Sequence, residues 1–119
     1  MIIDEKARTV HFMNLYPASF DAIRTGRKTV EMRLNDEKRQ MIKIGDLIRF
    51  TNTVTDENLT VKVVEKNVYP SFRELYSAHD KISIGYTDTE YADPSDMFEY
   101  YSEEKIEKYG ALALVIALI

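Results

Sequence analysis

The end of the chain carries its longest apolar run, the nine residues 111–119, directly after Gly110. A helix needs about 20 apolar residues to cross a bilayer, so this run is too short to do so. Both alternating sets of positions in the run are apolar, which is typical of a strand that is covered on both faces. We therefore expect a central or well-covered strand over residues 111–118, and no membrane span.

Alternation of apolar and polar residues predicts four earlier strands. They cover residues 9–15, 28–34, 46–52 and 59–69. The turn at Gly45 and the polar turn at residues 56–58 are short, and short connections favour antiparallel pairing of the strands they join.

Helix signals lie between these strands. Pro17 suits the first position of a helix and Gly26 suits a left-handed C-terminal cap, which predicts a helix over about residues 17–25. Ser71, Asp93 and Ser102 each suit an N-cap position, and Pro94 follows the second of them. Residues 81–92 should form a connecting loop, and the polar residues 35–43 should hold at most one helical turn.

This order of elements predicts an α+β fold, with a small, mostly antiparallel curled sheet or barrel and flanking helices. A domain typically holds about 100–150 residues, so the 119 residues should form a single domain, 1–119. The chain has no cysteine, which excludes a disulfide framework, a thiolate zinc site and a cysteine nucleophile. Its first residues lack the apolar core of a signal peptide, and we expect a cytoplasmic protein.

Charge is unevenly distributed along the chain. The net charge of −4 argues against a general nucleic-acid coat protein. Residues 24–49 nevertheless hold eight basic and four acidic side chains, so this segment is +4 and the remainder −8. A basic face on an acidic body suits a small anionic ligand or one short stretch of RNA. An ordinary solvated face explains the same count equally well.

The densest polar segment is residues 26–36. On the predicted strand, Glu31 and Arg33 project from one face together with Thr29, whereas Lys28 falls on the opposite, mostly apolar face. Glu31 and Arg33 can pair with each other, which contributes little at a solvated surface. They can also hold a polar ligand together, because the planar fork of an arginine suits a phosphate or a base edge.

The segment Gly26-Arg27-Lys28-Thr29-Val30-Glu31-Met32-Arg33 resembles the signature G-x-K-x-x-E-x-R of the ASCH family, a group within the PUA-like superfamily. Residues 44–50 are similar to the turn and strand G-D-x-I-x-F of that family. Residues 100–110 resemble the end of its small stand-alone bacterial and archaeal members. The similarity covers most of residues 9–119.

This resemblance implies a PUA-like β-barrel with a ligand cleft between barrel and helices, and a partner that is RNA, a nucleotide or a nucleoside. The expected ligand-binding residues are Lys28, Glu31 and Arg33 on the cleft floor, Arg39 at its rim, His11, and two stacking tyrosines, Tyr100 and Tyr109. Only two histidines are present and no cysteine, so we expect no metal site, and no cofactor is implied.

Two other functions stay open at this stage. At least one small family member hydrolyses the acetyl amide of acetylcytidine with a lysine, a threonine three residues later and a distant acid. Lys28 matches that lysine, Glu31 stands at the threonine position, and Glu74 and Asp80 are near candidates for the acid. Lys28 and Glu31 would then be the catalytic pair of an amidohydrolase, with Glu31 as the base for a water and Lys28 stabilising an oxyanion.

The remaining alternative is an interaction module, in which the signature residues form only an internal ion-pair network. A serine hydrolase is disfavoured, since Ser19, Ser71 and Ser102 fall where helix caps are needed.

Overall fold

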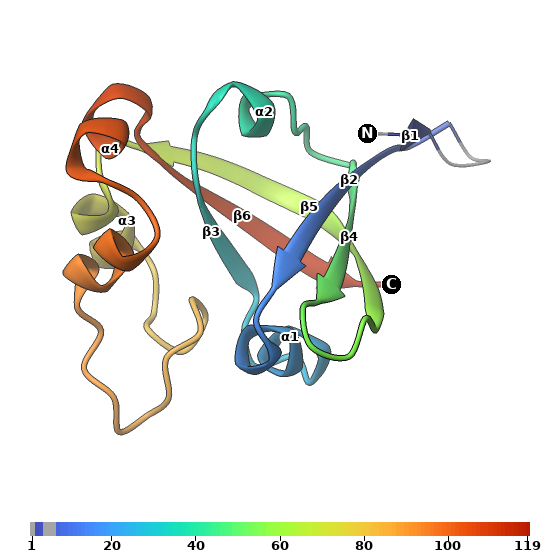
Figure 1. Cartoon of the computed structure of the whole chain (residues 1–119), viewed down its shortest axis with the longest axis horizontal. Coiled ribbons are helices and arrows are strands. Elements are labelled where there is room, and N and C mark those ends of the chain that lie inside the picture. Colours follow the sequence, from blue (N-terminus) through green and yellow to red (C-terminus); the bar gives the residue numbers. More distant parts are fainter. Residues whose placement is uncertain (1, 4–6) are drawn as a thin grey trace.

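The structure, a computed structural model, describes residues 2–3 and 7–119 and contains one sheet of six strands. The strands are β1 (Ile2–Ile3), β2 (Thr9–Leu15), β3 (Val30–Leu34), β4 (Leu47–Asn52), β5 (Asn58–Tyr69) and β6 (Ala111–Leu118). Their spatial order is β1-β2-β4-β5-β6-β3. The pair β2–β4 is parallel and every other neighbouring pair is antiparallel. The sheet curls like a barrel without closing (Figure 1). A mostly antiparallel sheet with flanking helices is the expected α+β class.

In the part of the chain that the structure describes, five helical segments lie between these strands. They are α1 (Pro17–Arg24), α2 (Glu37–Gln40), α3 (Phe72–Ala78), the 3-10 helix η1 (Pro94–Glu99) and α4 (Glu103–Tyr109). The predicted caps are present, because the side chains of Ser71, Asp93 and Ser102 each accept a hydrogen bond from a backbone N–H of the following turn. Within the described residues, no helix is long and apolar enough to span a membrane.

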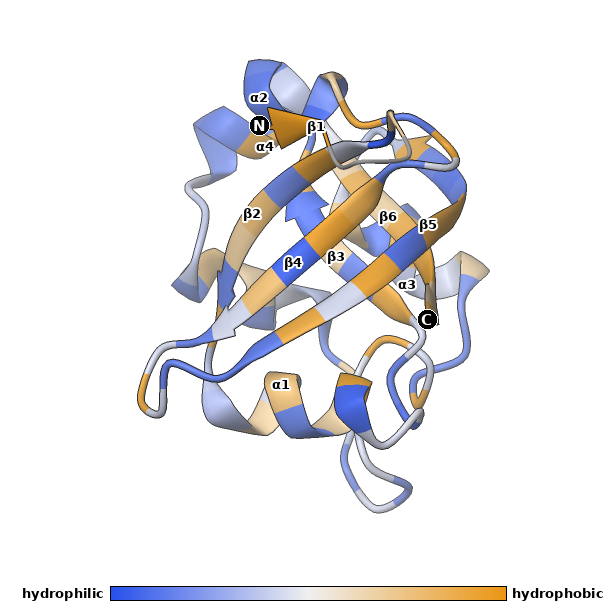
Figure 2. Cartoon of the chain, turned by 90° about the vertical axis from the view of Figure 1, so that its right-hand side faces the viewer, coloured by the Kyte–Doolittle hydropathy of each residue, from blue (hydrophilic) through white to orange (hydrophobic). Residues whose placement is uncertain are grey.

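Two hydrophobic cores lie on opposite faces of β6. Leu112, Leu114 and Ile116 belong to a core that also takes residues from α1, β2, β4 and β5. Ala111 and Ala113 belong to a second core, beneath α3, η1 and α4. The predicted central strand is therefore confirmed: β6 lies between β5 and β3 and is covered on both faces. Figure 2 shows α1 across one end of the curled sheet.

Strand β3 lies at an edge of the sheet, and its register fixes where its charges point. Glu31 is opposite Leu114 and Arg33 is opposite Leu112, so both charged side chains face the side of the first core, where the sheet fails to close. The expected shared face of Glu31 and Arg33 is thus confirmed. The expected position of Lys28 is wrong, because β3 begins only at Val30 and strand alternation does not govern a residue that precedes it.

Candidate functional site

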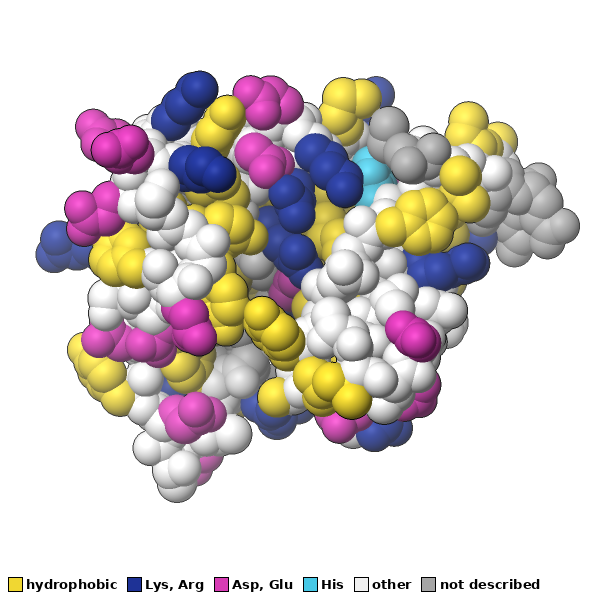
Figure 3. Space-filling model, in the orientation of Figure 1, with side chains coloured by type: hydrophobic (Ala, Val, Ile, Leu, Met, Phe, Trp, Pro, Cys, Tyr) yellow, Lys and Arg dark blue, Asp and Glu magenta, His cyan; other side chains and the backbone are white. Residues whose placement is uncertain are grey.

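A cleft of about 380 Å³ opens between the unclosed side of the sheet and the C-terminal helices. Its lining comes from the β2–α1 junction, from β3 and the segment that leads into it, from α3 and η1, and from the loop that joins α3 to η1. The hollow is visible near the centre of Figure 3, with Lys and Arg side chains gathered in and above it. A cleft of this size suits a small organic ligand.

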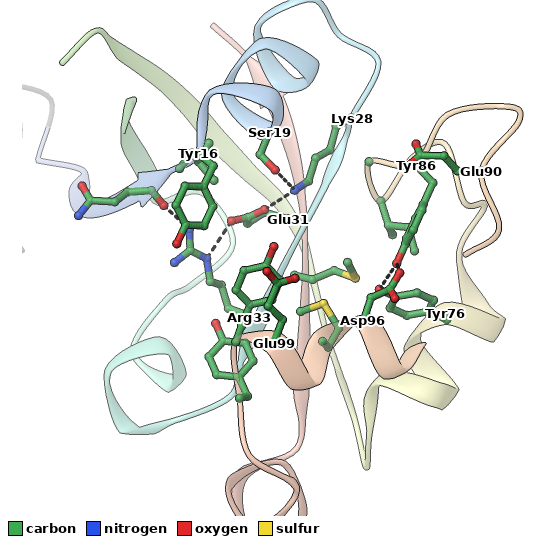
Figure 4. Close-up of a pocket in the computed structure, with 18 residues that line it drawn as sticks. Tyr16, Ser19, Lys28, Glu31, Arg33, Tyr76, Tyr86, Glu90, Asp96 and Glu99 are labelled. Carbon is green, nitrogen blue, oxygen red and sulfur yellow. Dashed lines mark hydrogen bonds and ion pairs between the residues drawn. The ribbon is translucent and has the colours of Figure 1, made fainter. Parts of the chain in front are cut away.

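The floor of the cleft is a cluster of three charged side chains. Lys28 Nζ lies 2.8 Å from Glu31 Oε1, and Arg33 Nε donates to Glu31 Oε2 over 2.8 Å. Lys28 and Glu31 are only 7% and 3% exposed, yet both line the cleft. Figure 4 shows the three side chains converging on the carboxylate. A buried carboxylate that holds two cations is stable only when both remain in place.

The charge state of this cluster follows from two opposing effects. Burial alone raises the pKa of the Glu31 carboxyl, but the positive charges and hydrogen bonds of Lys28 and Arg33 outweigh burial and lower that pKa overall. Burial likewise lowers the pKa of the Arg33 guanidinium, and the Glu31 carboxylate reverses this to a net increase. Glu31 is therefore ionised and has both oxygens occupied, which suits it to electrostatic positioning better than to general-base chemistry.

Ser19 is a site residue that sequence reasoning missed. Its expected role as a helix cap is wrong, since Tyr16 occupies the N-cap position of α1 and Ser19 lies within the first turn. The Ser19 hydroxyl instead lines the cleft, 3.5 Å from Lys28 Nζ.

Two exposed tyrosines stand at the cleft. The rings of Tyr16, at the β2–α1 junction, and Tyr100, after η1, have centroids 6.5 Å apart and planes inclined by 38°. Both rings are largely solvent-exposed, at 65% and 52%. Tyr101 also lines the cleft and stacks on Phe72 behind it. Of these lining tyrosines, only Tyr100 had been singled out from the sequence.

The other end of the cleft carries a chain of hydroxyl groups. Tyr76 Oη and Tyr86 Oη are 2.9 Å apart, and Tyr86 Oη donates to Asp96 Oδ2 over 2.7 Å. Burial raises the pKa of both phenols, and for Tyr86 the hydrogen bonds to Tyr76 and Asp96 raise it further. Both phenols therefore keep their protons at neutral pH. Figure 4 places this group away from Arg33 and Tyr16.

The segment predicted as a connecting loop supplies part of this wall. Ile84, Gly85, Tyr86 and Glu90 all line the cleft. Arg27 holds the loop against the start of β3, because its Nη1 lies 3.2 Å from each of the carbonyl oxygens of Gly85 and Tyr86. No periodic pattern marks a loop of this kind, so its role in the cleft was not predictable from local sequence signals.

The acids that reach the cleft are Glu31, Glu90, Asp96 and Glu99. Asp80 and Glu74 do not line it: the Asp80 carboxylate accepts from the backbone N–H of Ile82, and Glu74 pairs with the Ser71 hydroxyl at the start of α3.

Three of the expected ligand residues lie outside the cleft lining. His11 Nε2 is 2.8 Å from Asp46 Oδ2, in a part-buried pair that joins β2 to the turn before β4. Arg39 Nη1 donates to Asp36 Oδ2 over 2.8 Å, at the start of α2. The Tyr109 hydroxyl donates to Glu37, which ties α4 to α2. Each of these side chains is thus engaged by a partner within the fold.

The described residues contain no group of three or more histidines and acids that could hold a metal ion.

Comparison with known proteins gives one family. The family model of the ASCH domain matches residues 13–119. The crystal structure of hypothetical protein PH0355 is 31% identical over 93% of this chain and 100% of its own, with a TM-score of 0.79. The solution structure of protein PF0455 from Pyrococcus furiosus is 31% identical over 93% of this chain and 98% of its own, with a TM-score of 0.73. ASCH from Zymomonas mobilis is 18% identical over 92% of this chain and 68% of its own, with a TM-score of 0.66, and shares the fold. No curated protein matched the chain.

Proposed function

The chain belongs to the ASCH domain family, and from that premise we propose that its cleft binds a nucleobase, presented by an unpaired stretch of RNA or by a nucleotide or nucleoside. One observation carries this proposal: the buried cluster of Lys28, Glu31 and Arg33 forms the floor of an open cleft whose walls are rich in tyrosine. Charged groups that read the edge of a ring, beside aromatic rings that stack on its face, are what recognition of an unpaired base requires.

The positions of the aromatic rings support stacking. Tyr16 and Tyr100 both line the cleft, and their ring centroids are 6.5 Å apart, within the 4.5–7 Å range of an aromatic pair, so the two exposed rings offer one continuous aromatic surface for a base. Stacking tolerates any base, so these two rings would supply affinity, and the polar floor would supply selectivity.

The charge at the Arg33 end supports a place for phosphate. Arg33 Nε donates a hydrogen bond to the Glu31 carboxylate, and Nη2 donates one to the Asn14 carbonyl oxygen. Within the described residues, Arg33 Nη1 has no hydrogen-bond partner. The phosphate backbone of a bound strand would therefore leave the cleft at the Arg33 end, and Figure 3 shows Lys and Arg side chains gathered in and above the hollow.

The test is a titration by calorimetry with a short unpaired RNA and with single nucleosides, for the wild type, Arg33→Ala and the matched exposed arginine Arg24→Ala. We expect Arg33→Ala to weaken binding at least tenfold and Arg24→Ala to leave it unchanged, because a charge-assisted hydrogen bond contributes about 1.5–3 kcal/mol. RNA binding should weaken with added salt, whereas nucleoside binding should not. Circular dichroism would confirm that both variants are folded. No binding of RNA or of any nucleoside would refute the proposal.

Amide hydrolysis of a modified nucleoside is a second candidate, favoured by the Ser19 hydroxyl 3.5 Å from Lys28 in the same cleft. The Ser19 hydroxyl or a water would add to the acyl carbon while the Lys28 ammonium stabilises the oxyanion; the amide C–N bond would then break, and the proton of the attacking O–H would pass to the departing cytidine amino group. If Ser19 attacks, a water would then cleave the resulting ester and release the acid. Acetylcytidine is the substrate to assay, by chromatography of the released cytidine. Turnover that disappears in Lys28→Ala and persists in the exposed control Lys62→Ala would support this candidate; absence of turnover in the wild type would remove it.

A further inference from the structure

The Tyr86 end of the cleft has a defined arrangement of protons. Tyr86 has one hydroxyl proton, and it goes to Asp96 Oδ2, the nearest acceptor at 2.7 Å. The 2.9 Å contact between the two phenols must then use the proton of Tyr76, with Tyr86 accepting. The chain of donation therefore runs from Tyr76 to Tyr86 to Asp96 and ends on a carboxylate.

The Asp96 carboxylate, at the end of this series of hydrogen bonds, has one oxygen left for a ligand. Asp96 Oδ2 is occupied by Tyr86, and Asp96 Oδ1 makes no hydrogen bond within the described part of the chain. Because an ionised carboxylate only accepts, a ligand atom at this oxygen must be a donor.

The acids around Asp96 strengthen this requirement. Two cations, Lys28 and Arg33, line the cleft, against four carboxylates: Glu31, Glu90, Asp96 and Glu99. Glu31 holds both cations at the floor, so no cation of the lining is left for Glu90, Asp96 and Glu99. Glu90 accepts from the Thr87 backbone N–H and feels the charges of Arg27 and Lys81, whereas no ion pair within the described residues engages Asp96 or Glu99. At Asp96 a phosphate would meet like charge and a carbonyl oxygen would meet a second acceptor, whereas an amino group would donate to the carboxylate.

We propose that Asp96, positioned by Tyr86 and Tyr76, is a specificity-determining residue that selects a base with an exocyclic amino group and directs any phosphate towards the Arg33 end. This inference rests on the proposed function and adds an orientation to it: the donor edge of the base faces η1, and its acceptor atoms face Lys28 and Arg33. Cytidine and adenosine meet this requirement. Uridine and inosine carry a carbonyl in place of the amino group, and donation of their neighbouring ring N–H to Asp96 would bring that carbonyl oxygen against the same carboxylate.

The test compares two matched ligand pairs by calorimetry, cytidine with uridine and adenosine with inosine. Within each pair the ring size is the same, so a difference in affinity reports the effect of the amino group. The wild type should bind the amino member of each pair about tenfold or more tightly, because a site built for a donor rejects the analogue that lacks it. Asp96→Asn keeps the shape of the side chain but adds a hydrogen-bond donor. In this variant the affinities for the two members of each pair should differ by no more than about threefold. Asp88→Asn, an acid-to-amide change in the neighbouring loop but outside the cleft lining, should keep the wild-type preference.

Tyr86→Phe tests the positioning role separately. It removes the proton that Asp96 receives and leaves the ring in place, so the preference for the amino member should shrink while uridine affinity stays unchanged. A structural defect would instead weaken all four ligands alike.

Failure of this inference is distinguishable from failure of the proposed function. Equal affinities for both members of each pair, with binding still lost in Arg33→Ala, would overturn the role of Asp96 and leave the nucleobase site intact. Binding of none of the four nucleosides and of no RNA would overturn both.

Discussion

Arg33 on β3 reaches across the unclosed side of the sheet to Asn14 on β2, where its Nη2 donates to the backbone carbonyl oxygen over 2.8 Å. No backbone ladder joins β3 to β2. The same guanidinium holds Glu31 through Nε, so one side chain links the two strands on either side of the opening and also forms part of the cleft floor.

Replacing Arg33 should therefore lower stability as well as binding. Arg33→Met retains the apolar stem but loses the hydrogen bonds to the Asn14 carbonyl and the Glu31 carboxylate, and we expect a loss of about 1–3 kcal/mol in the free energy of unfolding measured in urea. The exposed pair of Arg24 with Asp21 is the control, because Arg24→Met should change stability by less than about 0.5 kcal/mol. Equal effects of the two substitutions would show that Arg33 does not brace the sheet.

Glu31 should give stability a specific dependence on pH. Its pKa is lower in the folded chain than its ordinary value of 4.5, so the carboxylate contributes stability that is fully present above pH 4.5 and is lost as pH falls through the folded pKa. Glu31→Gln leaves Lys28 and Arg33 buried without a counter-charge and should cost about 3 kcal/mol or more at pH 7.

The stability difference between wild type and Glu31→Gln should narrow as pH falls below 4.5, in urea unfolding at a series of pH values. The exposed Glu65→Gln serves as the control, with a small difference that stays constant over the same range. A gap for Glu31→Gln that does not change with pH would contradict the ion-pair account of the cleft floor.

The sequence predicted most elements of this fold because their signals are local. Pro17 and Gly26 frame α1, Ser102 caps α4, and the doubly apolar run after Gly110 predicted the central strand β6. The parallel pairing of β2 with β4 joins segments far apart in the chain, and no local pattern encodes it.

The site was only partly predictable for a related reason. The signature identified Lys28, Glu31 and Arg33, which do converge at the cleft. Tyr86 and Asp96 come from a loop and a 3-10 helix, where no periodicity shows which way a side chain points. His11 and Tyr109 are engaged by acids distant in the sequence, Asp46 and Glu37, which no local pattern pairs with them. Arg39 is engaged by Asp36, three residues earlier in the cap of the same helix, a local pairing that sequence reasoning overlooked.

Gly85 should matter to the site through Lys28. A Cβ at Gly85 would lie 3.1 Å from Lys28 Cδ, so Gly85→Ala should push the ammonium away from Glu31. Gly45 also has a positive φ, +96° against +113°, but a Cβ there meets nothing within 4 Å. Both alanine variants incur backbone strain of about 1–3 kcal/mol. Only Gly85→Ala should also weaken nucleoside binding in calorimetry; the same loss in Gly45→Ala would show that strain alone is responsible.

Tyr16 and Tyr100 should carry the stacking energy. Each substitution to alanine should reduce affinity for a short unpaired RNA by about 1–3 kcal/mol, the usual contribution of one stacked base. Tyr91 is 82% exposed and lies outside the cleft lining, so Tyr91→Ala should leave affinity unchanged. A fluorescence titration of each variant with the same labelled RNA would measure all three affinities. If all three variants bound like the wild type, the two rings would have no part in binding.

The most direct measurement of where a ligand binds is an NMR titration of the ¹⁵N-labelled protein with cytidine. Binding in the cleft should move amide signals of residues 28–33, 84–86 and 96–101, which lie far apart in the sequence and meet at this one hollow. Signals around the part-buried His11–Asp46 pair should stay in place. Saturating cytidine that moves no signals, or moves only those outside these three segments, would contradict a nucleobase site in the cleft.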